Sequence, residues 1–75
     1  MTLFVIEAYG GQAGTGAVAH FRVNANSYPE ALRLVKESRL AHAYGWFMLV
    51  DRTGELDVDE PGIVDEGTGP YIGAL

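Results

Sequence analysis

The fold is decided by residues 19 to 35, which read AHFRVNANSYPEALRLV. In the first half of this stretch, Ala19, Phe21, Val23 and Ala25 alternate with polar residues. A period of two places alternate side chains on opposite faces of a β-strand. The pattern therefore predicts a strand that buries one face and exposes the other.

A helix is predicted directly after this strand. Ser27 and Glu30 form a capping box, in which the serine oxygen accepts a hydrogen bond from an early helix amide and the glutamate reaches back to the cap. Pro29 falls in the first turn, where its missing N–H removes no helix bond. Apolar and polar residues then follow opposite sides at helical spacing. We therefore expect an amphipathic helix that ends at about residues 42–43.

The segment before residue 19 predicts a partner for the first strand. Residues from Thr2 to Tyr9 are mostly branched or aromatic, which favours a strand. Residues 10 to 16 contain four glycines, a composition typical of a long turn. These glycines superficially resemble a phosphate-binding loop, but the Lys-Ser/Thr pair is missing and no helix follows them. We therefore expect an antiparallel hairpin with a flexible connection.

The stretch after the helix predicts a third strand. Residues from Trp46 to Val50 are all apolar, and the predicted strand continues through Asp51 to Arg52. A continuous apolar run is typical of a buried central strand. Residues 52 to 55 include Gly54 and predict a tight turn at the end of this strand.

A fourth strand is predicted over residues 55 to 59, where Leu56 and Val58 alternate with acids. The Pro-Gly pair at positions 61 and 62 ends it. Residues 63 to 75 predict an irregular acidic tail, with a short added strand and folding back on the sheet left open as alternatives. The expected fold is α+β: one small domain over residues 1 to 62, with a ββαββ antiparallel sheet and one amphipathic helix on one face.

Composition sets further bounds. A chain of 75 residues buries only about 60% of its unfolded surface, so support from another chain is plausible. The absence of cysteine excludes disulfides and thiolate metal sites. The apolar run from Leu3 to Ile6 is short, has no basic lead-in and is followed by Glu7, unlike a signal peptide or membrane span. We expect a soluble, cytoplasmic protein with no membrane partner.

One helix covers only one face of a sheet, so the strand side chains divide into two sets. The predicted helix-facing set is Phe4, Ile6, Phe21, Val23, Phe47, Leu49, Leu56 and Val58. The predicted second set is also apolar and consists of Leu3, Val5, Tyr9, Val18, Trp46, Met48 and Val50. Burial of such side chains contributes about 1.5–3 kcal/mol each, so this second face should be covered.

Three coverings of the second face are open. The tail could fold back and lay Ile63, Val64, Tyr71 and Ile72 across it. A homodimer could pack sheet on sheet through Trp46 and Met48, or a different protein could dock there, since aromatic and Met side chains are enriched at interface centres.

The net charge of −5 is unevenly distributed. Residues 1 to 54 carry four acids and five bases, whereas residues 55 to 75 carry six acids and no Lys or Arg. Such a segment repels phosphates and attracts basic surfaces. These acids, the predicted binding surface for a basic protein partner, are Glu55, Asp57, Asp59, Glu60, Asp65 and Glu66.

No pattern of catalytic or metal-binding residues emerges, and we expect neither enzymatic activity nor a metal or cofactor. The acids do not follow the spacing of an EF-hand, and His20 and His42 lack a matched carboxylate for zinc. Of the serines, Ser27 is a cap and Ser38 falls within the predicted helix, so neither is placed as a nucleophile.

Direct nucleic-acid binding is also disfavoured. It would depend on Arg22 and on the helix bases Arg33, Lys36 and Arg39. Affinity for nucleic acid rests on neutralising phosphate charge, which the net charge of −5 opposes.

The segments Phe21–Ala25, Ser27–Ala31 and Trp46–Val50 together resemble a pattern found in small phage-encoded proteins, among them anti-CRISPR proteins. The resemblance spans about residues 2 to 60 and is one of size and sheet-plus-helix layout. It implies a non-enzymatic inhibitor in the host cytoplasm, whose acidic surface occupies a basic nucleic-acid-binding site on a host complex. The alternative is a self-associating structural or assembly module, a homodimer through Trp46 and Met48.

Overall fold

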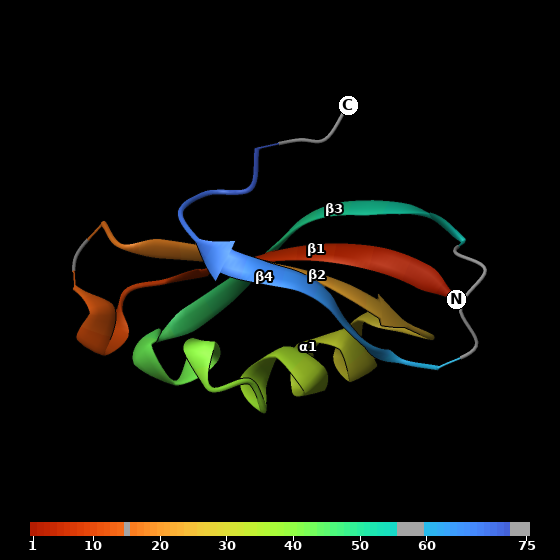
Figure 1. Ribbon diagram of the computed structural model, residues 1–75, viewed down its shortest axis with the longest axis horizontal. Helices are drawn as coiled ribbons and strands as arrows, with labels where there is room; N and C mark the ends of the chain where they lie inside the picture. Colours follow the sequence, from red (N-terminus) through yellow and green to blue (C-terminus); the bar gives the residue numbers. More distant parts are fainter. Residues whose placement is uncertain (15, 56–59, 73–75) are drawn as a thin grey trace.

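Two long strands form the centre of the sheet. In the computed structural model, which describes residues 1–14, 16–55 and 60–72, β1 (Thr2–Tyr9) pairs antiparallel with β2 (Val18–Ala25) along its whole length (Figure 1). The predicted hairpin is confirmed. Its connection contains a single turn of 3₁₀-helix, η1 (Gly11–Ala13).

The other two strands flank this hairpin, so the sheet order is β3-β1-β2-β4. Strand β3 (Trp46–Glu55) pairs antiparallel with β1, and β4 (Gly62–Thr68) pairs antiparallel with β2. The chain therefore has the α+β fold with the ββαββ order that the sequence predicts.

Strand β3 corrects two predictions. It was expected to be a buried central strand, but it lies at the edge of the sheet. An apolar run indicates that a strand packs against something, and it carries no information about the strand's position in the sheet. The predicted tight turn at residues 52–55 is also wrong, because β3 continues through them to Glu55 and pairs with β1 to its end.

Strand β4 shows that the irregular tail predicted from residue 63 begins instead with a strand, the alternative that the sequence left open. Residues 62–68 form a strand that completes the second edge, with Ile63 packed against the core and Asp65 opposite Arg22. Its sequence contains two glycines and two acids, so neither alternation nor propensity indicates it, and pairing with β2 decides its conformation. The fourth strand predicted over residues 55–59 falls largely on residues 56–59, outside the described residues.

Helix α1 (Tyr28–Lys36) begins where the capping box places it. The Ser27 hydroxyl accepts a hydrogen bond from the Glu30 N–H at 3.4 Å, and the Glu30 carboxylate accepts one from the Asn26 N–H at 2.7 Å. The predicted end near residues 42–43 is wrong, because α1 stops at Lys36 and the chain continues as a separate 3₁₀ turn, η2 (Leu40–Ala43). The predicted end rested on Gly45, and no glycine or proline between Lys36 and Ala43 marks the break in the sequence.

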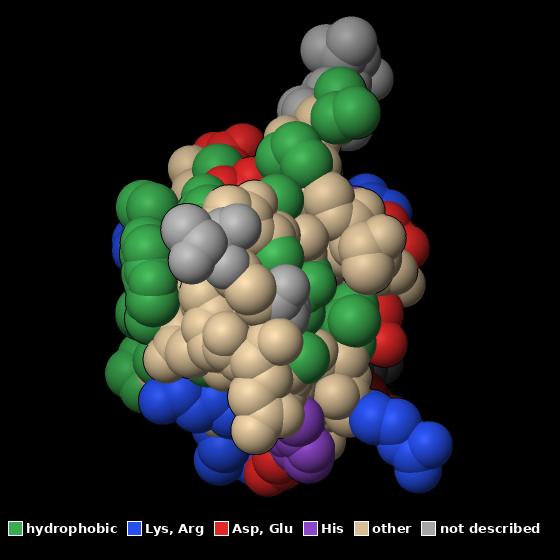
Figure 2. All heavy atoms as spheres, turned by 90° about the vertical axis from the view of Figure 1, so that its left-hand side faces the viewer, with side chains coloured by type: hydrophobic (Ala, Val, Ile, Leu, Met, Phe, Trp, Pro, Cys, Tyr) green, Lys and Arg blue, Asp and Glu red, His purple; other side chains and the backbone are tan. Residues whose placement is uncertain are grey.

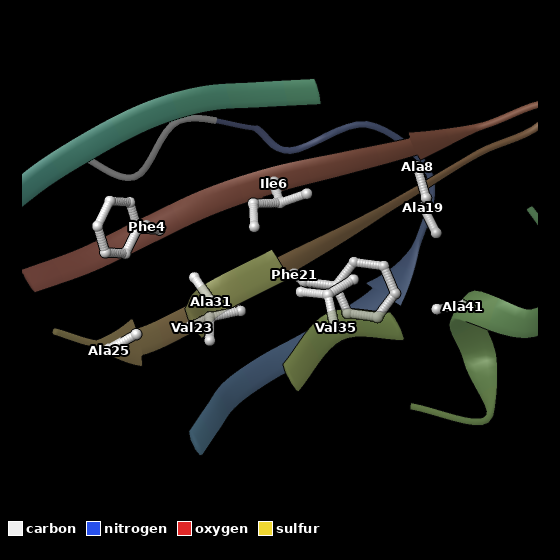
Figure 3. Close-up of a cluster of buried hydrophobic side chains, with 10 residues drawn as sticks. All are labelled: Phe4, Ile6, Ala8, Ala19, Phe21, Val23, Ala25, Ala31, Val35 and Ala41. Atoms are coloured by element: carbon white, nitrogen blue, oxygen red, sulfur yellow. The ribbon is translucent and has the colours of Figure 1, made fainter. Parts of the chain in front are cut away.

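The core lies between α1 and one face of the sheet (Figure 3). The helix-facing set is confirmed at Phe4, Ile6, Phe21 and Val23, all 3% exposed or less, while Phe47 and Leu49 pack against this core as partly buried residues. Leu56 and Val58 lie outside the described residues. Small side chains complete the cluster: Ala8, Ala19, Ala25, Ala31 and Ala41, together with Val35.

Candidate functional site

The face of the sheet that turns away from α1 is called the outer face here. Its central side chains come from β1, where Val5 is fully buried and Leu3 and Glu7 are each 9% exposed. The predicted second set contains Leu3 and Val5 but not Glu7, whose carboxylate is buried beside them. Among the described residues no second helix lies over this face, so its centre must be covered in another way.

The covering segment is residues 69–72, called the C-terminal strap here, which leaves β4 on the side of the sheet away from α1 (Figure 1). The Gly69 N–H donates a hydrogen bond to the Val18 carbonyl at 2.7 Å, and His20 Nδ1 lies 3.1 Å from the Gly69 carbonyl oxygen. The Tyr71 N–H donates to Glu7 Oε2 at 2.9 Å. The strap is therefore anchored to both central strands.

The predicted folding back of the tail over the outer face is confirmed only in part. Tyr71 is half-buried over the outer face, but Ile63 packs on the helix side of the sheet. Val64 is 50% exposed and Ile72 is 84% exposed. The strap covers the middle of the outer face and leaves apolar side chains uncovered elsewhere.

Glu7 is a functional candidate that the sequence analysis missed. Its Oε2 accepts the Tyr71 N–H, and its Oε1 accepts a hydrogen bond from the Tyr9 hydroxyl. Both carboxylate oxygens thus have donors at a site from which water is largely excluded. The only sequence signal was an acid within an otherwise apolar strand, which reads equally well as an exposed position.

The hydrogen bond to Glu7 raises the pKa of Tyr9 above its ordinary value of 10.0, and burial and the glutamate's negative charge act in the same direction. A raised pKa in the folded state stabilises the fold below the unfolded-state value, and this contribution is lost as the pH rises through the folded-state value. We expect the Tyr9 phenolate to form above pH 10.0 in the wild type and at lower pH in Glu7→Gln.

The Tyr9 titration is measurable by ultraviolet absorbance, as the difference between each protein and the same protein carrying Tyr9→Phe. Glu7→Gln retains the shape of the side chain and removes its charge, which makes it the matched comparison. An unchanged Tyr9 titration in Glu7→Gln would contradict the assignment of Glu7 as the cause.

Exposed apolar side chains gather along β3, beside the covered centre. Trp46 is 53% exposed, and Met48 and Val50 are each 44% exposed. The Tyr9 ring stacks on the Trp46 indole, with 4.5 Å between ring centroids and 22° between planes. These four residues are called the β3 strip here. Of these, Trp46 and Met48 were predicted from the sequence, and the structure places them on the edge strand β3 with Val50 and beside Tyr9 at the end of β1.

Figure 2 shows hydrophobic side chains gathered along one edge of the molecule. Large apolar side chains this exposed and this close together are unusual on a small monomeric protein unless they contact a partner. Aromatic and Met side chains are also those enriched at the centres of protein interfaces.

Only some of the acids of the predicted binding surface lie within the described residues. Asp65 lies 3.5 Å from the Arg22 Nε, and Glu66 Oε1 accepts a hydrogen bond from the Ser38 hydroxyl at 2.7 Å. Because Asp65 pairs with Arg22 and Glu66 pairs with Phe21, the two acids lie on opposite faces of the sheet. Glu60 is exposed, Glu55 is the last residue of β3, and Asp57 and Asp59 lie outside the described residues.

The histidines are placed apart, His20 on β2 beneath the strap and His42 exposed on η2. In residues 1–14, 16–55 and 60–72, no three His, Asp or Glu side chains come together in a way that could hold a metal ion. Over the same residues, no helix has both the length and the apolar character needed to cross a membrane. Comparison with family models, with curated proteins and with solved structures found no match to this chain.

Proposed function

We propose that the chain is a non-catalytic protein-binding module whose contact surface is the β3 strip. The observation that carries this proposal is the exposure of Trp46, Met48 and Val50, 44–53% each, on a single edge strand. Full burial of side chains of this size contributes about 1.5–3 kcal/mol each. A partner that covered the strip would therefore gain several kilocalories per mole of apolar burial.

The strap restricts where such a partner can sit. It occupies the centre of the outer face, over Glu7 and His20, and holds Tyr71 there. A flat partner laid across the whole outer face would meet the strap first. The β3 side of the face has no such covering among the described residues, so the contact is confined to the strip and to the open edge of β3.

A second candidate is the acidic inhibitor of the anti-CRISPR type, in which the carboxylates occupy a basic nucleic-acid-binding site on a host complex. It is favoured by the charge distribution, because the last 21 residues carry six acids and no Lys or Arg. Glu60, Asp65 and Glu66 are all exposed. This mode would use the β4 edge, which lies at the far side of the sheet from the β3 strip, and the acids that precede β4 in the sequence.

One capture experiment tests the two candidates against each other. Tagged wild type, Met48→Lys and the triple variant Asp57→Lys/Asp59→Lys/Glu60→Lys are incubated with nuclease-treated bacterial lysate that also contains a second copy carrying a different tag. We expect Met48→Lys to lose the partner that the wild type retains, by tenfold or more, because a buried lysine charge is costly at an apolar interface. We expect the triple variant to retain this partner.

Val64→Lys is the matched control, since Val64 is 50% exposed on the opposite edge strand and gains the same charge. It should behave as the wild type does. Loss of the partner in the triple variant, with retention in Met48→Lys, would transfer the function to the acidic surface. Equal capture by all four proteins would reject both surfaces.

A further inference from the structure

We infer that the partner on the β3 strip is a second copy of this chain, and that the two copies join their β3 strands edge to edge into one continuous sheet. The inference rests on the proposed function and names its partner. It differs from a sheet-on-sheet homodimer, because the contact is the open backbone edge of β3 together with the strip beside it.

The two edges of the sheet are protected unequally. Edge strands present unpaired N–H and C=O groups, which proteins normally shield with charges, prolines, bulges or short strand length. Both edge strands have register irregularities, β4 opposite Arg22 and Val23 and β3 at Val50 and Gly54. Strand β4 in addition has only seven residues, begins directly after Pro61 and carries Asp65 and Glu66. All of these features discourage another strand from pairing with its free edge.

Strand β3 is less protected in its first half, where the register irregularity at Val50 is the one such feature. It is the longest strand, with ten residues, and no described strand lies against its outer edge. Its first five residues, Trp46–Val50, contain neither charge nor proline, and its charges begin at Asp51. A long apolar edge of this kind readily pairs with another strand.

The sequence of β3 is compatible with itself in an antiparallel pair. If the two-fold axis passes through Met48, Trp46 lies opposite Val50 of the second copy and Phe47 lies opposite Leu49. Directly opposed residues share a face, so Phe47 and Leu49, which pack against the core, continue the core across the junction. The exposed side chains of the two strips meet on the other face, and Asp51 falls outside the apolar centre.

The net charge of −5 per chain does not oppose this pairing. On β3 itself, Asp51 is followed by the opposite charge of Arg52. Asp65 and Glu66 lie on β4, three strand spacings from β3, or about 14 Å. In the joined sheet, the two β4 strands would be separated by seven spacings, or about 33 Å. Charges so far apart interact weakly at physiological salt, where the screening length is about 8 Å.

The test uses single cysteines, because the chain contains none of its own. Met48→Cys and Val64→Cys are oxidised mildly and compared on non-reducing gels, while light scattering measures the mass of the wild type over a range of concentrations. Opposed Cβ atoms in an antiparallel pair lie about 4.5–5.5 Å apart, near the reach of a disulfide. We expect a wild-type mass that approaches twice 8.1 kDa, and a covalent dimer for Met48→Cys that forms at least tenfold faster than for Val64→Cys.

Circular dichroism serves to check that both variants are folded. We expect them to be, because both side chains are about half exposed. A wild type that stays at 8.1 kDa at high concentration, or a dimer that cross-links faster through Val64→Cys, would overturn the edge-to-edge pairing. The proposed function is tested separately. It would survive a monomeric wild type if Met48→Lys still lost a different captured protein, and it would fail if Met48→Lys lost nothing.

Discussion

Phe21→Ala is expected to remove a large share of the free energy of unfolding of this chain. Phe21 is fully buried, pairs with Ile6 across the central hairpin and lies at the centre of the cluster beneath α1. Truncation of a buried Phe to Ala costs about 3–5 kcal/mol, from lost transfer free energy and from the cavity left behind. At about 0.05–0.15 kcal/mol per residue, a 75-residue domain has a total stability of only about 4–11 kcal/mol.

The measurement for Phe21→Ala is urea denaturation followed by circular dichroism, at one fixed protein concentration so that any association is held constant. Phe47→Ala is the matched control, since it removes the same atoms from a position that is only partly buried, on the edge strand β3. It should lower the free energy of unfolding by clearly less than Phe21→Ala does. Equal losses at the two positions would contradict the placement of the core around the central hairpin.

Gly11→Ala is expected to be the most damaging substitution outside the core. Gly11 has a φ of +70°, and a Cβ built on it would lie 2.6 Å from the Gly45 nitrogen and 2.8 Å from the Ala43 carbonyl oxygen. Residues other than glycine rarely adopt this backbone conformation, which costs them about 1–3 kcal/mol. The contact with backbone atoms adds to this, because η1 must move away from η2 and disturb the start of β3.

Gly14→Ala separates the two causes. Gly14 also has a positive φ, +103°, but a Cβ there would meet nothing within 4 Å. Gly14→Ala should therefore lose only the conformational part of the stability, and the additional loss in Gly11→Ala should measure the steric contact. Both losses are read from urea denaturation midpoints. A larger loss in Gly14→Ala than in Gly11→Ala would show that η1 and η2 do not make this close approach.

The sequence predicts the elements whose signals are local. The alternation in Ala19–Ala25 and the Ser27–Glu30 capping box place β2 and the start of α1 correctly, because each signal depends on neighbours a few residues apart. Position within the sheet is not local. The first half of strand β3 is as apolar as a central strand, yet β3 lies at the edge. The reason is that β4 pairs with β2, about 40 residues before it in the chain, and not with β3.

The candidate site divides in the same way. Trp46 and Met48 were predictable, since large apolar residues on a sheet face without a helix need a cover. Glu7 was not, because its burial depends on the Tyr71 backbone, 64 positions away. A strand pattern shows which face a side chain occupies but not what crosses that face. The strap, and the gathering of exposed apolar side chains along β3, therefore required the structure.

The order of the strands in the sheet differs from the order in which the ribosome synthesises them. Strands β1 and β2 are synthesised first, yet the described strands that flank them in the sheet, β3 and β4, are synthesised after α1. At about 5–20 residues per second, the 32 residues from the end of α1 to the end of β4 take roughly 2–6 s to appear. During this interval the nascent hairpin has two unpaired edges, so translation speed through this region determines how long the chain is open to aggregation.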